Sequence, residues 1–593
     1  MGRTRVSAPH FAMLALVWRI HRSAWLLVLL SAGLQIAIFP LPNLYFLCWA
    51  AVAPLLLALL RTREPDTLQL LAGVRLLPAG PGQAFLLAYC CGILWYGGTC
   101  YWIYNTMRQY GGVGTAAALG LLLLFCLYLA LYHGAFGLLI SLLANRAGGA
   151  GAQSSRGEGA PANPGVRKVL LLAPFLWVAV ELARTRITGF PWDLLGVAQV
   201  DNVPLARIAT VTGVYGLSLE IMVVNTALAA AFVIRGEKGR RSKRVRLLLA
   251  TVAAVAVLQG GRWISPPPAP ADHSVRLVQA NVPILQGSDW TKEYFEGTVR
   301  DLSLISLNNP GINAGSELRL ESGKDRTGLV ASPSSAGIAA LHPDLIVWPE
   351  SPAPFYSTDP TFRDDVSNIA RVTQTWILVG SLGIRNAGET PEHATQLYNS
   401  ASLVSPAGEW VGRYDKMHLV PFGEYVPFKR VFGFAGGLTK EVGDFSSGVS
   451  RAPLQAGDSR LGVFICYESI FPDEIRQLAS NGAQVLVNVS NDGWYGDSGA
   501  YAQHLKQARM RAVENNRWLL RDTNTGVTAS IDPYGRVVSS IPRKVRAALD
   551  ANYALTNVTT FYTRHGDWFA YLCAIISVAG LLTHFLFRAR TEP

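Results

Sequence analysis

The sequence predicts a two-part protein: a helical membrane domain of about eight spans, and an α/β domain placed before the last span. Half of the 593 residues are hydrophobic and only 16% are charged, which is too few charges for a soluble protein of this length. The apolar residues concentrate in residues 1–264 and again after Trp568. The polar stretch between them spans roughly 300 residues, which is ample for a hydrophobic core of its own.

Each predicted span is a mostly apolar run, because a helix needs about 20 such residues to cross a bilayer. The eight runs are Ala24–Phe39, Leu44–Leu60, Ala84–Tyr104, Ala116–Leu143, Val169–Ala183, Ile208–Ile234, Leu247–Leu258 and Trp568–Phe587. The first, fifth and seventh runs are short, and Arg262 interrupts the end of the seventh. No small-residue cleavage site follows the first run, so we interpret it as an anchor and not as a signal peptide.

Basic residues predict the orientation, because Lys and Arg collect in cytoplasmic loops beside spans. With eight spans, the basic residues of both termini and of the loops after the even spans all fall on one side. The densest cluster is Arg235–Arg246. The α/β domain then lies outside the cytoplasm. The net charge of +12 follows partly from this bias, and it does not indicate nucleic-acid binding, because the basic residues lack interleaved aromatics.

The polar domain is predicted at residues 273–558, after a stiff Pro-rich linker at residues 265–272. Strand-like apolar runs alternate with helix-like stretches from Val275 to about Leu555, which favours an α/β domain. The last span is placed at residues 568–587. The stretch Asn308–Ala340 is rich in Gly, Ser, Asn and charged residues, so we expect an inserted flexible loop there.

Cys466 is the first candidate for a catalytic residue. It is the only cysteine of the polar domain, since the other six lie in apolar stretches, so a disulfide within the domain is excluded. It follows the apolar run Leu461–Ile465, which could hold a nucleophile rigidly. Tyr467 and Glu468 come next, and backbone N–H groups at this point are natural oxyanion donors. The alternative is a buried, inert cysteine.

Two further runs place ionisable groups at the ends of predicted strands. Glu350 follows an apolar run, and partial desolvation would raise its pKa towards that of a general base; the alternative is a solvated loop carboxylate. Lys416 precedes a Pro/Gly-rich loop and could stabilise an oxyanion or a thiolate; the alternative is a surface lysine paired with Asp415. Glu424 could orient Lys416 or the base, and we interpret His418 as structural.

Together these runs resemble the Glu-Lys-Cys triad of the nitrilase, or carbon-nitrogen hydrolase, superfamily. They read WPES at Glu350, YDKMHLVPFGEYVPF at Lys416 and ICYE at Cys466. The long second run is similar to one branch of it, the apolipoprotein N-acyltransferases, and so are NVSNDGWYG at 488–496 and GFPW at 189–192. The likeness extends from about residue 24 to residue 587. The 308–340 insertion has no counterpart in the compact family pattern.

The resemblance implies a four-layer α-β-β-α sandwich on the periplasmic side of a bacterial inner membrane. It also implies ping-pong acyl transfer. Cys466 would attack the sn-1 ester of a phospholipid, typically phosphatidylethanolamine, with Glu350 as base and Lys416 stabilising the oxyanion. The fatty acyl chain would then pass from the Cys466 thioester to the N-terminal amine of a diacylglyceryl cysteine in an apolipoprotein.

The same resemblance implies supporting residues around the triad. Glu424, Tyr467 and Glu468 are matched positions that should support the site, and Trp494 should line the acyl or headgroup pocket. Trp290 is a candidate for the family's early substrate-site tryptophan, although an unusual spacer precedes it. No cofactor is implied, and no cluster has the spacing of metal ligands. Nothing in the sequence demands a partner chain, so a monomer is expected.

Two other functions remain compatible with these residues. One is a membrane-tethered hydrolase or amidase that uses the same triad on another substrate and passes the acyl group to water. The other is a non-catalytic scaffold or transporter that keeps the domain for binding, for which replacement of Cys466 would leave function intact.

Overall fold

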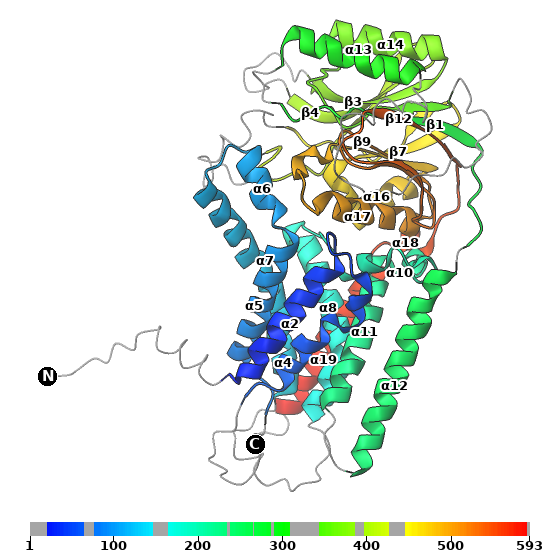
Figure 1. Cartoon of the computed structure of the whole chain (residues 1–593). Helices are drawn as coiled ribbons and strands as arrows, with labels where there is room; N and C mark the ends of the chain where they lie inside the picture. The colour runs from blue at the N-terminus through cyan, green and yellow to red at the C-terminus, as the bar shows by residue number, and fades with distance from the viewer. Residues whose placement is uncertain are drawn as a thin grey trace, which may run out of the picture.

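The computed structural model describes residues 20–63, 76–145, 164–233, 238–264, 266–285, 290–308, 343–385, 396–425 and 445–589. A bundle of helices carries a layered α/β domain on one of its ends (Figure 1). The predicted insertion lies outside the described residues from residue 309 on. Much of the basic segments from which the orientation is predicted also lies outside the described residues, at 1–19, 64–75, 146–163 and 234–237.

The eight predicted spans all coincide with helices, although several are broken. The helices are α2 (Arg22–Ile38), α3 (Cys48–Ala51) with α4 (Ala53–Leu60), α5 (Pro81–Thr99) with α6 (Trp102–Gln109), α7 (Thr115–Ala144), α8 (Pro164–Ala183), α10 (Ala209–Thr212) with α11 (Val214–Val233), α12 (Lys238–Gly260) and α19 (Trp568–Ala589). Among the described residues, four helices are long and apolar enough to cross a membrane, or five if α5 and α6, bent by 52°, form one span. The predicted count of eight is therefore not confirmed.

The break between α10 and α11 shows why an apolar run need not be one helix. Gly213 joins the two helices with φ +64°, a left-handed conformation that residues with a side chain rarely adopt. A Cβ at this position would lie 2.5 Å from the ring of Tyr562. The turn is thus shaped by a segment more than 300 residues away, which no local hydrophobic pattern reveals.

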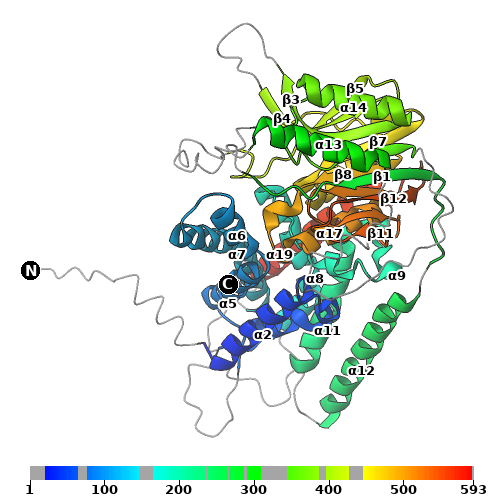
Figure 2. The ribbon, with the colours of Figure 1, turned by 45° about the horizontal axis from the view of Figure 1, so that its top comes forward.

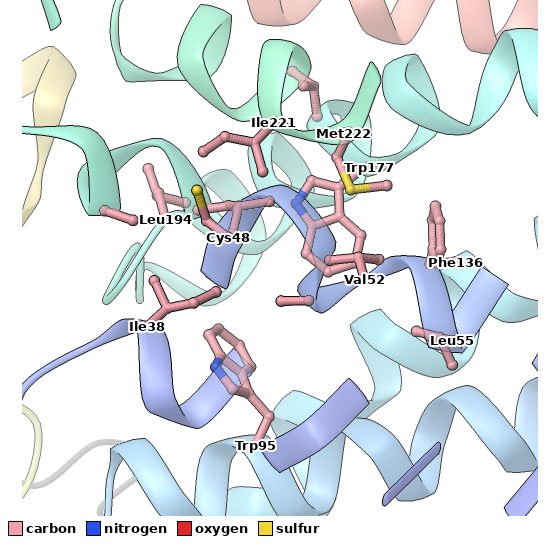
Figure 3. Packing of buried hydrophobic residues seen from close by; sticks show 14 of the residues in the cluster. Ile38, Cys48, Val52, Leu55, Trp95, Phe136, Trp177, Leu194, Ile221 and Met222 are labelled. Atoms are coloured by element: carbon pink, nitrogen blue, oxygen red, sulfur yellow. The ribbon is translucent and has the colours of Figure 1, made fainter. Parts of the chain in front are cut away.

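Small residues let the helices of the bundle approach closely. A Cβ on Gly137 of α7 would lie 2.4 Å from the carbonyl oxygen of Ala84 in α5, as is typical of packed membrane helices. The bundle core is one buried cluster to which α2, α4, α5, α7, α8 and α11 contribute. Figure 3 shows Ile38, Leu55, Trp95, Phe136, Trp177 and Met222 in it.

The α/β domain consists of two six-stranded sheets, with orders β12-β1-β2-β3-β4-β5 and β11-β10-β9-β8-β7-β6. The strands of the first sheet are β1 (His273–Gln279), β2 (Leu345–Val347), β3 (Trp376–Arg385), β4 (Gln396–Val404), β5 (Trp410–Asp415) and β12 (Ala547–Tyr553). Those of the second are β6 (Leu454–Ala456), β7 (Ser459–Ile465), β8 (Val485–Ser490), β9 (Leu519–Thr523), β10 (Thr528–Ile531) and β11 (Val537–Ile541).

Helices cover both outer faces of the sheet pair. Helices α13 (Lys292–Asn308) and α14 (Pro360–Thr373) lie on the first sheet, away from the bundle, and α16 (Pro472–Ser480) and α17 (Ala500–Asn515) lie between the second sheet and the bundle (Figures 1 and 2). Alternation along β2 fits these layers: Leu345 and Val347 join the core between the sheets, while Ile346 joins the core under α13 and α14. The predicted α-β-β-α sandwich is confirmed.

Candidate active site

Three strand ends, from both sheets, converge on one site. Glu350 lies three residues after β2, and Lys416 directly follows β5; both strands belong to the first sheet. Cys466 directly follows β7 of the second sheet. All three side chains are buried. The structure therefore brings together the three residues that the sequence singles out, although they are far apart along the chain.

Lys416 is the centre of a buried ion-pair cluster. Its Nζ lies 2.9 Å from Glu424 Oε1 and 3.4 Å from Glu350 Oε1. The side-chain amide of Asn399 donates to the same two carboxylate oxygens, at 2.8 Å for Glu350 and 2.7 Å for Glu424. One cation and one amide thus share two carboxylates, which satisfies groups that would otherwise be costly to bury.

The cluster keeps the lysine charged. Burial favours the neutral amine, but Glu424, Glu350 and the thiol of Cys466 act in the opposite direction and raise the pKa of Lys416 above its usual value. A buried ammonium of fixed position can stabilise a developing oxyanion strongly, because little water is present to screen it. The alternative of a surface lysine paired with Asp415 is wrong, since Lys416 is 1% exposed.

Glu350 is aimed by backbone contacts on both of its sides. Its Oε2 accepts a hydrogen bond of 2.7 Å from the backbone N–H of Asn491, which directly follows β8 of the second sheet. On the other side, Gly380 of β3 lets the Pro349–Glu350 segment approach closely, because a Cβ there would lie 2.0 Å from the carbonyl oxygen of Pro349. The alternative of a solvated loop carboxylate is wrong, since the side chain is buried.

Cys466 has a backbone conformation suited to a sharp turn rather than to a continuing strand. Its φ is +48°, and it opens the short helix η10 (Cys466–Ile470). Burial and the negative charge of Glu350 raise the pKa of the thiol, while Lys416 and a hydrogen bond with Ser490 lower it. The net direction is upward, so the resting thiol is protonated and needs a base to become a nucleophile.

Glu468 ties the nucleophile's strand to the lysine's loop. Its carboxylate accepts hydrogen bonds from the backbone N–H groups of Ile465 (2.6 Å), Met417 (2.7 Å) and His418 (3.1 Å), and from the hydroxyl of Tyr414 (2.9 Å). Burial raises the pKa of Glu468, and the backbone donors act against it. Removal of this group would release the ends of β5 and β7 from each other.

The remaining predicted residues lie at different distances from this cluster. The hydroxyl of Tyr467 donates to the carbonyl oxygen of Gly189 in a membrane loop, at 3.4 Å. The ring of Trp494 meets that of Tyr110, which follows α6, with centroids 5.4 Å apart. Trp290 packs on Tyr294 and on the core beneath α13 and α14, and in the described part of the chain no contact joins it to the triad.

Sequence reasoning missed two residues that organise the site. Asn399 lies within β4, whose sequence QLYNSASLV mixes polar and apolar residues, so its amide does not stand out there. His504 lies in α17, and its Nε2 is 3.0 Å from the carbonyl oxygen of Cys466. Neither residue belongs to a motif of its own, and their partners are distant in sequence. Among the described residues, no group of three or more His, Cys, Asp or Glu side chains could hold a metal ion.

Both the helical region and the α/β domain of the chain match known protein families. Residues 282–560 match the carbon-nitrogen hydrolase family, and residues 31–227 match the apolipoprotein N-acyltransferase N-terminal domain. An apolipoprotein N-acyltransferase from Geobacter metallireducens is 34% identical over 579 residues, which cover 96% of this chain and 97% of the relative. One from Nitrosomonas europaea is 34% identical over 533 residues, covering 88% and 93%.

Among solved structures, an amidase from Nesterenkonia sp. aligns with 50% of this chain and 94% of its own, at 17% identity and a TM-score of 0.33. The relatives that span nearly the whole chain decide the assignment. The chain belongs to the apolipoprotein N-acyltransferase family, and it is an acyltransferase.

Proposed function

We propose that the chain transfers a fatty acyl group from the sn-1 position of a membrane phospholipid, with phosphatidylethanolamine as the expected donor, to the N-terminal amine of an S-diacylglyceryl cysteine in apolipoproteins. The names of the relatives support the acceptor. The chemistry rests on one observation: a cysteine at a strand end, in a left-handed backbone conformation, lies within the electrostatic influence of a buried glutamate and lysine.

In the first half-reaction, Glu350 takes the proton from Cys466 Sγ while the sulfur attacks the ester carbonyl carbon. The raised pKa of the thiol requires this base. The charge that develops on the carbonyl oxygen is stabilised by the Lys416 ammonium and by backbone N–H groups after Cys466. The ester C–O bond then breaks, the proton on Glu350 passes to the departing oxygen, and a lysophospholipid leaves a thioester on Cys466.

In the second half-reaction, the neutral amine of the diacylglyceryl cysteine attacks the thioester carbonyl. Glu350 accepts a proton from the amine, the C–S bond breaks, and the sulfur recovers a proton. The product carries an amide, so the lipoprotein leaves with three acyl chains. Glu424 holds Lys416 in place, and Glu468 keeps the two strand ends together during both steps.

The arrangement in the membrane is part of the proposal. Residues 1–264 and 568–587 would form eight spans, 265–272 the linker, and 273–558 a periplasmic catalytic domain of a monomeric inner-membrane protein. Helix α12 supports the orientation, because its N-terminal end lies far from the α/β domain (Figure 1) and the exposed basic residues Arg241 and Lys243 belong to that end of the helix. A domain resting on the bilayer can receive two substrates that are both held in lipid.

Mass spectrometry of the purified protein tests the proposal directly. Incubation with phosphatidylethanolamine vesicles should add the mass of one fatty acyl group to the peptide that contains Cys466. The adduct should be absent from Cys466→Ala and from Glu350→Gln, and present in Cys126→Ala, which alters a cysteine of the bundle. An adduct on another residue, or none on the wild type, would overturn the assignment.

A chase of the trapped adduct separates a transferase from a hydrolase. A diacylglyceryl peptide with a free amine should discharge the thioester much faster than buffer alone does, and the peptide should gain the acyl mass. Equal discharge rates with and without the peptide amine would favour the hydrolase alternative. Replacing phosphatidylethanolamine with phosphatidylglycerol in the loading step measures the headgroup preference.

A further inference from the structure

The backbone of Cys466 is held in a conformation that its own residue type disfavours. A non-glycine residue with φ near +48° is strained, and such strain persists only where the surroundings fix it. The Cys466 side chain leaves the backbone at this point, so any relaxation of φ would redirect the sulfur. The contacts of the Cys466 carbonyl group therefore help to set where the thiol points, together with the hydrogen bond between the thiol and Ser490.

Among the described residues, the side chain of His504 holds the carbonyl oxygen of Cys466. The distance from Nε2 to this oxygen is 3.0 Å. Because a carbonyl oxygen can only accept, Nε2 must carry a proton. With the proton on Nε2, Nδ1 of the neutral ring is an acceptor, and it lies 3.1 Å from Arg521 Nη2, which can donate to it. Asp492 lies beside this pair, with Oδ1 2.9 Å from Nδ1 and Oδ2 2.7 Å from Arg521 Nη2. The imidazole is fully buried, so no water competes for these bonds.

The membrane domain holds the other side of the same imidazole. The ring of Trp192 stacks on His504 at an interplanar angle of 13°, and Tyr495 meets it edge-on at 74°. Trp192 belongs to the loop Gly189–Trp192 between membrane helices, and its Nε1 donates to Gln503 Oε1 at 2.7 Å. Gln503 in turn donates to the carbonyl oxygen of Pro40, just after α2, at 2.8 Å.

We propose that His504 is a positioning residue for the nucleophile, and that the membrane loop Gly189–Trp192 sets its orientation. The hydrogen bond from Nε2 holds the Cys466 carbonyl group in the left-handed turn, which aims the sulfur at Glu350 and Lys416. The stacked Trp192 fixes the imidazole plane. The catalytic alignment thus depends on the docking of the sandwich on the bundle. The inference rests on the proposed role of Cys466 and adds to it residues that touch neither substrate nor sulfur.

A pair of variants of similar size separates positioning from packing. His504→Gln keeps an amide N–H near the place of Nε2, whereas His504→Met fills the space without a donor. With the full-length protein in detergent and phosphatidylethanolamine as acyl donor, we expect the maximal rate of Cys466 acylation in His504→Met to fall about 100-fold, the loss typical of a misplaced reacting group. The donor concentration at half-maximal rate should stay unchanged, and His504→Gln should recover most of the rate.

The exposed His565, changed to Met, serves as the control and should acylate as the wild type does. A purely structural His504 would give equal losses in the Gln and Met variants, together with parallel losses of thermal stability, and that result would overturn the inference. Wild-type acylation rates in His504→Met would also overturn it. If wild-type Cys466 takes no acyl group at all, the proposed function fails instead, so the two failures are distinguishable.

Trp192 provides a second, independent test should His504→Met not accumulate as folded protein. Trp192→Phe keeps an aromatic ring over the imidazole, and Trp192→Leu does not. The inference requires slower acylation in the leucine variant than in the phenylalanine variant at equal stability. Equal acylation rates in the two would contradict the role of the membrane loop.

Discussion

Helices α14 and α17 each cover one sheet of the sandwich, yet they are buried in different ways. Helix α14 buries a stripe that includes Phe362, Val366, Ile369 and Ala370, and exposes its other face to water. Helix α17 is buried over most of its surface. Its buried residues include polar and charged side chains: Gln503, His504, Lys506, Gln507, Arg511, Glu514 and Asn515. Hydrophobic burial explains the first helix but not the second.

The partners of α17 come largely from the membrane domain. Lys506 pairs with Asp201 at 2.9 Å, and Glu514 accepts a hydrogen bond of 3.0 Å from the backbone N–H of Val214 at the start of α11. Buried polar groups are tolerable only when they are paired. The inner half of the sandwich is therefore completed by the bundle, whereas the outer half is complete by itself.

The largest expected effect lies where the two sheets meet, at Lys416. In Lys416→Met we expect acyl transfer to fall at least about 10³-fold, because the oxyanion loses its cation, and Glu350 and Glu424 are left buried without it. Single-turnover acylation of Cys466 is the measurement. Lys292→Met changes an exposed lysine of α13 and should keep the full rate. A mild loss in Lys416→Met would show that the ammonium is not part of the chemistry.

The second effect compares one arginine from each helix. Arg511 of α17 is buried and donates to Glu514 at 2.9 Å. Arg511→Leu leaves that carboxylate without its cation and should cost about 3–5 kcal/mol of unfolding free energy. Arg371 of α14 is exposed, and Arg371→Leu should change stability by about 0.5 kcal/mol or less. Chemical denaturation in detergent measures both, and similar losses in the two variants would remove the contrast between the helices.

The third effect compares a glycine that has no room for a Cβ with a glycine that has room for one. In Gly380→Ala the new Cβ meets the carbonyl oxygen of Pro349 and must displace Glu350, so we expect about a 100-fold slower acylation. Gly297 lies in α13, where a Cβ meets only the end of Arg300 at 3.8 Å. Gly297→Ala should therefore keep the rate and stabilise the protein by about 0.5–1 kcal/mol. An active Gly380→Ala would mean that the position of Glu350 tolerates a shift.

The sequence alone predicts the parts of this protein that depend on local patterns. Apolar runs mark the helices of the bundle, and alternating strand and helix runs mark the sandwich. Glu350, Lys416 and Cys466 stand out because each follows an apolar strand run and each can do chemistry in a buried place. Local patterns do not show that these residues meet, because they follow strands of two different sheets and lie far apart in the sequence. Only the family resemblance predicts that they form one site.

The features that sequence reasoning missed depend on long-range contacts. The break at Gly213 follows the packing of Tyr562, and the burial of α17 depends on partners in membrane loops. Asn399 is one of several polar residues of β4, and its importance appears only when Glu350 and Glu424 lie beside it. The roles of Trp290 and Trp494 stay predictions.

The smallest effect is a pH dependence carried by Glu514 on the inner helix. Burial raises the pKa of Glu514 from 4.5 to about 7, although Arg511 and the N–H of Val214 act against this. Between these two values the folded protein keeps a proton that the unfolded chain has released, so this group's contribution to stability falls as the pH rises. Relative to the wild type, Glu514→Gln should therefore gain roughly 2 kcal/mol from pH 5 to pH 8.

Denaturation midpoints at the two pH values, with Asp364→Asn on the exposed face of α14 as control, measure this gain. A constant difference between Glu514→Gln and the wild type would mean that the carboxylate is ionised throughout this range. The ionised Glu514 would then keep its pair with Arg511 within α17 and its hydrogen bond from the backbone N–H of Val214 across this range, and the docking of the sandwich would not respond to pH through this group.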